Sequence, residues 1–144
     1  MRQVITRAAL AGAGAIGGLI GGALMFTPKA FLEMSQVVVE RDPSLMSEIT
    51  APSGVLLISA AFLIFSAIKL RFARQALLIG AVVYGSYGVA RLIGMLLHGV
   101  PSESLIAAMI FEIAIAVLLG ALRLTSQRQP YETKADADLV QISA

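Results

Sequence analysis

Two oppositely charged residues, Arg91 and Glu112, lie inside apolar stretches of the sequence. A charge within hydrocarbon costs at least about 2.5–3.5 kcal/mol and normally faces a partner or a water-filled cavity. Arg91 lies six residues before Leu97, and Glu112 lies seven residues after Leu105, on either side of one short connection. Both are therefore roughly 9–10 Å from the same ends of their helices, at about 1.5 Å per residue. Antiparallel neighbours joined so closely would bring the two side chains together.

Tyr84 and Tyr87 precede Arg91 by seven and four residues, so the three share one helix face, and His98 extends that face to its end. Two interpretations of the charge pair are open. The pair could neutralise itself and fix the register of two helices. Alternatively, it could flank a small cavity for a polar headgroup, a quinone ring or a proton path. The candidate ligand-binding residues are Arg91, Glu112, Tyr84, Tyr87, His98 and Glu48.

Other reaction chemistries find little support. His98 is the single histidine and the chain has no cysteine, which leaves a poor ligand set for a transition metal or haem. The serines of the second apolar stretch lack a histidine base at matching depth. No glycine-rich loop precedes a Lys-Ser or Lys-Thr pair that could hold phosphate. We therefore predict no catalytic residue, no metal and no cofactor, and an enzyme is the least expected class.

The composition indicates a membrane protein. Of the 144 residues, 58% are hydrophobic and only 14% are charged, against about 25% charged in ordinary soluble domains. The net charge of +2 is too small, and its residues lie too close to apolar runs, for a nucleic-acid-binding face. Since the sequence contains no cysteine, we expect neither a disulfide nor a lipoprotein anchor. The length allows about four spans and leaves nothing for a soluble domain.

Four apolar stretches of near-bilayer length predict four transmembrane helices, at residues 8–26, 53–68, 75–97 and 105–122. None alternates in the manner of a barrel strand, so the predicted class is all-α. The second stretch is the shortest, but Thr50 can cap its helix and Pro52 suits a first turn, which moves the start before the apolar run. We predict a transmembrane domain at residues 1–124 and a mobile polar tail at residues 125–144.

The basic residues predict an orientation, because cytoplasmic flanks carry the excess of Lys and Arg. One side collects Arg2, Arg7, Lys69, Arg71, Arg74, Arg123, Arg128 and Lys134. The other holds Lys29 and Arg41, with the acidic Glu33, Glu40, Asp42, Glu48 and Glu103. We therefore predict that both termini are cytoplasmic and that the loops at residues 27–49 and 98–104 are external.

The first helix begins like a signal peptide, with basic residues before an apolar run, but that run exceeds a typical h-region of about 7–15 residues. We expect it to stay in place as a span. Its glycines form a ridge that allows close approach of another helix. The ridge consists of Gly14, Gly17, Gly18, Gly21 and Gly22. It could pack inside the bundle or serve as an interface for a partner or a second copy.

Residues 28–34, in the longer external loop, combine Phe31 and Leu32 with charged neighbours. The segment could be a lid. It could also be a connector that places its apolar side chains in the membrane interface, which is the interpretation we favour.

The third and fourth stretches, GVARLIGMLLHGVPSESLIAAMIFEIAIAVLLG, resemble an uncharacterised bacterial family of four-helix membrane proteins with a DoxX-like pattern. The resemblance covers residues 28–124 and is carried by Arg91, the segment HGVP at residues 98–101, and Glu112. Two features depart from that pattern. His98 replaces an Asp, and Thr50 replaces an Arg that usually follows the acidic residue at position 48.

The resemblance implies a four-helix fold in a bacterial inner membrane. Some DoxX-like proteins are similar to small subunits of quinone-linked oxidoreductases, and others to assembly helpers. Our leading hypothesis is a non-enzymatic accessory or assembly subunit that acts through helix contacts, in a larger membrane complex or a homo-oligomer surrounded by lipid. The alternative is a binding or transport protein with a lipid-, quinone- or proton-accessible pocket around Arg91 and Glu112.

Overall fold

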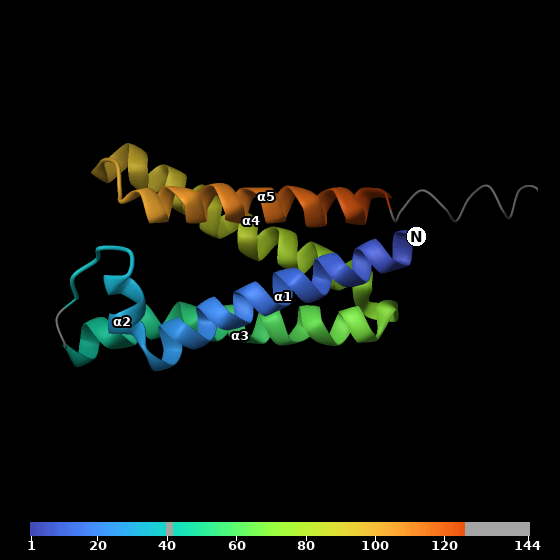
Figure 1. The fold of residues 1–144 in the computed structure, drawn as a ribbon, viewed down its shortest axis with the longest axis horizontal. Helices are drawn as coiled ribbons and strands as arrows, with labels where there is room; N and C mark the ends of the chain where they lie inside the picture. The colour runs from blue at the N-terminus through green and yellow to red at the C-terminus, as the bar shows by residue number, and fades with distance from the viewer. Residues whose placement is uncertain (40–41, 126–144) are drawn as a thin grey trace, which may run out of the picture.

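The computed structural model describes residues 1–39 and 42–125, and it forms a bundle of long helices (Figure 1). The elements are α1 (Arg2–Phe26), α2 (Pro28–Glu33), α3 (Pro43–Ile68), the 3-10 turn η1 (Leu70–Phe72), α4 (Ala73–His98) and α5 (Glu103–Thr125). The part of the chain described here contains no strand, which confirms the all-α class. The four long helices have 23 to 26 residues and are apolar enough to cross a membrane, which takes about 20 residues. The predicted tail at residues 125–144 lies, apart from Thr125, outside the described residues.

Helix α3 begins earlier than the sequence suggested. The carboxylate of Asp42 accepts a hydrogen bond from the Leu45 N–H at 2.8 Å, and Pro43 occupies the first helical position. Both features are typical of a helix start. The prediction that Thr50 caps this helix is therefore wrong. Thr50 lies inside α3, where its hydroxyl donates to the Ser47 carbonyl, and Pro52 is an interior residue.

The helices form two closely packed pairs, α1 with α3 and α4 with α5 (Figure 1). We call them the first and second hairpins. Lys69 and the turn η1 join one hairpin to the other. Figure 1 shows that the hairpins lie closest near the beginning of α1 and diverge toward α2. The axes of the two hairpins therefore separate in that direction.

The glycine ridge of α1 packs inside the first hairpin. A Cβ atom at Gly14 would lie 2.7 Å from Ile64 Cγ1 and 3.0 Å from the Ala60 carbonyl oxygen, both on α3. A Cβ at Gly21 would lie 3.1 Å from Leu56 Cβ. At Gly22, by contrast, nothing lies within 4 Å. Most of the ridge is thus covered by α3, so a docking partner would have to displace that helix to reach it.

The helices of the second hairpin also approach closely at two glycines, which the sequence interpretation did not single out. A Cβ at Gly80 would lie 2.6 Å from Leu119 Cδ1, and a Cβ at Gly88 would lie 2.6 Å from Ile113 Cγ1. Close backbone approach holds helices together in lipid, where burial of apolar surface supplies little driving force. The fully buried leucines of the core come from all four long helices. They are Leu10, Leu63, Leu77 and Leu119.

Replacing Gly14 by leucine is expected to destabilise the bundle by about 1–3 kcal/mol, because the new side chain overlaps Ile64 and the Ala60 carbonyl. Gly22→Leu is the matched control, since its Cβ enters open space. Thermal unfolding in detergent would measure both. Equal melting temperatures for the two variants would contradict the packing of α1 on α3.

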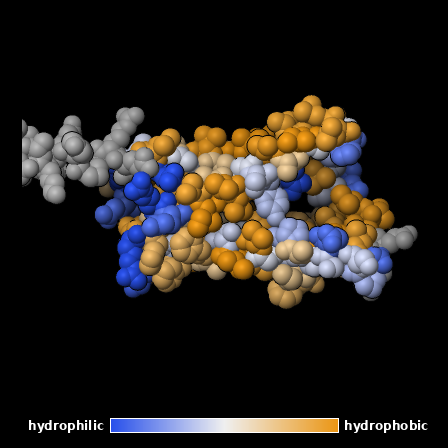
Figure 2. Space-filling model, turned by 180° about the vertical axis from the view of Figure 1, so that it is seen from behind, coloured by the Kyte–Doolittle hydropathy of each residue, from blue (hydrophilic) through white to orange (hydrophobic). Residues whose placement is uncertain are grey.

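The charges separate to opposite ends of the bundle. The basic end, where α1 begins and α5 finishes, carries all but one of the described Lys and Arg residues outside the Arg91–Glu112 pair. These are Arg2, Arg7, Lys69, Arg71, Arg74 and Arg123. The opposite, acidic end carries Lys29, Glu33, Asp42, Glu48 and Glu103. Figure 2 shows hydrophilic residues gathered at the basic end, on the left, and a long hydrophobic middle. Glu40, Arg41, Arg128 and Lys134 lie outside the described residues.

Candidate ligand-binding cavity

Arg91 and Glu112 meet in the second hairpin, as their equal depth in the sequence predicted. The Arg91 Nε atom lies 3.0 Å from Glu112 Oε2 and 3.3 Å from Oε1. The Glu112 side chain is 12% exposed, whereas that of Arg91 is 36% exposed. Within the described chain the terminal guanidinium nitrogens of Arg91 make no hydrogen bond. One edge of the guanidinium is thus neutralised, while its remaining donors stay free.

This ion pair lines a cavity of about 140 Å³ between the two hairpins. Five elements supply its walls, because α1, α3, α4 and α5 all border the space and α2 closes it from the acidic end. Its polar lining residues are Ser35, Tyr84, Tyr87, Arg91 and Glu112. The apolar ones include Ile20, Leu24, Leu56, Leu105 and Ala108. The space-filling view in Figure 2 is hollowed between the two halves of the molecule. The cavity therefore combines apolar walls with a few hydrogen-bonding groups, as small-molecule sites commonly do.

Tyr84 and Tyr87 connect α4 to the first hairpin. The Tyr84 hydroxyl donates to the Ala13 carbonyl of α1, and the Tyr87 hydroxyl donates to the Pro52 carbonyl of α3 at 3.3 Å. Tyr84 is buried, and a Cβ atom at Gly17 would lie 3.0 Å from its hydroxyl oxygen. Gly17 therefore makes room for the tyrosine, a role that its place in a glycine ridge did not reveal.

The segment around α2 forms the wall at the acidic end. Phe31 and Leu32 are half-buried and line the cavity. The chain then turns at Gln36, whose φ of 62° is rare for a residue other than glycine. The Ser102 hydroxyl donates to the Ser35 carbonyl at 2.9 Å, which ties this segment to the loop of the second hairpin. The predicted interfacial connector thus covers a cavity, and the hydrogen bond from Ser102 holds it there.

Two of the predicted site residues do not line this cavity. Glu48 is exposed on α3, because that helix begins at Pro43 and its first turns extend beyond the cavity. His98 is exposed at the end of α4 and lines a separate cavity of about 370 Å³ beside Pro101 and the loop between α4 and α5. Arg91 borders both spaces. The proposed ligand set is thereby reduced to Arg91, Glu112 and the two tyrosines.

Phe31, Leu32 and Ser35 join the site although the sequence interpretation did not assign them to it. The apolar pair beside charged residues was visible in the sequence, but its direction depends on the turn at Gln36. No group of three or more His, Asp or Glu residues that could hold a metal ion occurs within residues 1–39 and 42–125.

A family model described as a domain of unknown function, DUF4345, matches residues 5–122. The match spans α1 to α5 almost completely. Comparisons with curated proteins and with solved structures gave no significant match. The DoxX-like resemblance stays a prediction.

Proposed function

Since the chain belongs to the DUF4345 family, whose function is not established, we propose from its own cavity that it is a membrane protein that binds a small amphiphilic molecule between its hairpins. The observation that carries this proposal is that the Arg91–Glu112 pair borders an internal space. A purely structural pair would need no such space. An intramembrane ionisable residue beside a cavity is a usual mark of a functional site.

The size and chemistry of the cavity favour a neutral ring that accepts hydrogen bonds. Its volume of about 140 Å³ is close to that of a cavity of about 150 Å³ that binds benzene. Glu112 already neutralises Arg91, so the site offers an anion little net attraction. The free guanidinium N–H groups of Arg91 can donate to carbonyl oxygens, while the leucine and isoleucine walls contact the ring. A quinone headgroup has this combination of features.

The test uses two probes of nearly equal size, 2,5-dimethylbenzoquinone and p-xylene, which differ in the two carbonyl groups. Thermal unfolding of the detergent-solubilised chain is measured with each probe. We expect the quinone to raise the melting temperature more than p-xylene does. Glu112→Gln removes the carboxylate that positions Arg91. We expect it to weaken quinone binding about tenfold, which corresponds to the free energy of one charge-assisted hydrogen bond.

Two further variants keep the test independent of Glu112. Ala108→Phe fills the cavity without altering a charge and should abolish the quinone effect. Glu103→Gln removes an exposed carboxylate outside the cavity and should leave the effect intact. An equal response to the quinone in all three variants and the parent chain would rule out this cavity as the binding site.

The structure offers less support than the sequence did for the hypothesis that the protein is an accessory or assembly subunit. Its docking surface was the glycine ridge, which α3 covers at Gly14 and Gly21. A homo-oligomer or a larger membrane complex would have to form through other, lipid-facing surfaces. We propose no enzymatic activity and no nucleic-acid partner. From the separation of charges we also propose that both termini lie in the cytoplasm. From the DoxX-like resemblance we propose that the membrane is a bacterial inner membrane.

A further inference from the structure

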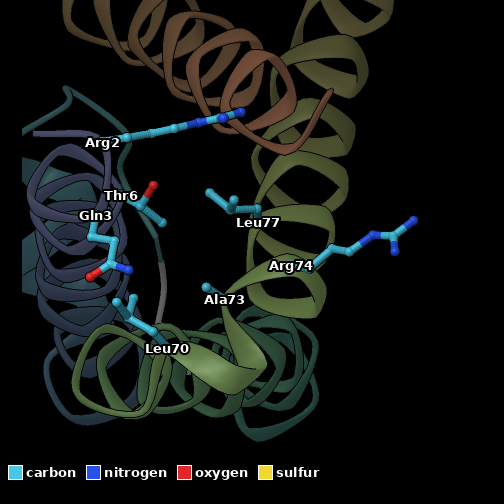
Figure 3. A pocket seen from close by; sticks show the side chains of 7 residues that line it. All are labelled: Arg2, Gln3, Thr6, Leu70, Ala73, Arg74 and Leu77. Atoms are coloured by element: carbon cyan, nitrogen blue, oxygen red, sulfur yellow. The ribbon is translucent and has the colours of Figure 1, made fainter. Parts of the chain in front are cut away.

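A second cavity lies at the basic end, remote from Arg91 and Glu112. It has a volume of about 290 Å³ and opens between the start of α1 and the start of α4. Its polar side chains include Arg2, Thr6 and Arg74, and its apolar lining includes Leu70 and Leu77. Figure 3 shows Arg2 extending from α1 across the space toward α5, whereas the Arg74 side chain points from α4 away from the space. Both arginines are exposed lining residues of one opening, but only the Arg2 side chain reaches across it.

Thr6 is a buried polar residue without a partner. It is only 8% exposed, and its hydroxyl makes no hydrogen bond to any described residue. In Figure 3 its side chain points into the space between α1 and α4. Among the described residues, its hydroxyl oxygen is not one of the buried atoms that lack a partner, so the oxygen is accessible. It is available to a group that enters the cavity.

The cations of this cavity are also unpaired. The ion pairs within the described chain are Lys29–Glu33 and Arg91–Glu112, and neither lies at the basic end. At the same end, the Nε atom of Arg123 is buried and has no hydrogen-bond partner among the described residues. No described carboxylate lies at this end to compensate these charges. The local chemistry calls for an anion.

We infer that this cavity binds the phosphate of an anionic phospholipid, with Arg2 reaching across the opening, the Thr6 hydroxyl as a further donor, and Arg74 at the rim adding positive charge. Arginine N–H groups are well suited to phosphate oxygens. Basic pockets between transmembrane helices are typical binding sites for anionic headgroups. Leu70 provides apolar surface beside the charges, which suits a lipid better than a free phosphate ester. The site lies where the helices end, at the depth of headgroups.

Native mass spectrometry of the full chain in detergent would test the inference. Phosphatidylglycerol and phosphatidylcholine with the same acyl chains serve as probes. We expect one phosphatidylglycerol to be retained preferentially, and the double variant Arg2→Gln and Arg74→Gln to lower that retention about tenfold or more. Lys69→Gln with Arg71→Gln is the matched control, because it removes the same charge from exposed residues outside the cavity.

Equal losses in the two double variants would overturn the inference, because diffuse surface charge would then explain the binding. Retention that persists without Arg2 and Arg74 would also overturn it. Thr6→Val keeps every charge and nearly the same shape, so it should still lower retention if the arginine variant fails to fold. Displacement of the lipid by millimolar glycerol 1-phosphate would assign the site to a soluble phosphate ester instead.

Discussion

Replacement of Glu112 by leucine is expected to destabilise the folded protein by about 2.5 kcal/mol, the lower range of the cost of an uncompensated charge within hydrocarbon. The variant leaves the Arg91 guanidinium without the carboxylate that now lies 3.0 Å away. Because Arg91 is 36% exposed and lines two cavities, we expect the loss to stay below that of a fully buried pair. Titration with denaturing detergent would measure the free energy of unfolding.

The double variant Arg91→Met with Glu112→Leu is the matched control. Removing both charges should restore most of the lost stability, since a buried ion pair replaced by apolar residues is often neutral or stabilising. The same double variant also separates the two interpretations of the pair. If it folds but no longer responds to 2,5-dimethylbenzoquinone, the pair serves binding. If single and double variants are equally unstable, the loss has another cause than the unpaired charge.

Cysteine labelling is expected to distinguish the two ends of the bundle clearly. The chain has no native cysteine, so a maleimide labels the introduced cysteine. Ser44→Cys places an exposed thiol at the acidic end, and Gln75→Cys places one at the basic end. With a membrane-impermeant maleimide and intact cells, the first should be labelled fully and the second only after permeabilisation. The physical reason is the excess of Lys and Arg at the basic end.

The reverse labelling pattern would place the basic end outside and remove the basis for cytoplasmic termini. Labelling of both cysteines in intact cells would contradict the four-span arrangement. Neither variant alters a charge, so the substitutions themselves leave the orientation signal intact. The orientation measured for each variant therefore applies to the parent chain.

The sequence predicted those features that depend on position along single helices. Four apolar stretches gave four helices, and equal distances from one short connection brought Arg91 to Glu112. Periodicity also placed Tyr84 and Tyr87 on the face of Arg91 that borders the cavity. These inferences need only the rise per residue and the shortness of one loop.

The sequence failed where the outcome depends on pairing between distant helices. The basic residues predict an orientation, but the sequence alone did not show that Arg2 and Arg74 line one cavity, which depends on α1 packing near α4. Gly17 faces the hydroxyl of Tyr84 only because the two hairpins meet there. Glu48 lies outside the cavity for a local reason, because Asp42 rather than Thr50 caps α3 and the first turns of that helix extend beyond the cavity.

The divergence of the two hairpins gives the protein a wedge shape in the plane of Figure 1. It occupies more cross-sectional area at the acidic end than at the basic end, so the two leaflets of a surrounding bilayer must make unequal room for it. A ligand that widened the cavity would enlarge this difference, and lateral pressure in the leaflet at the acidic end would oppose it. If the proposed ligand binds in this way, the packing of the surrounding lipid would affect its affinity.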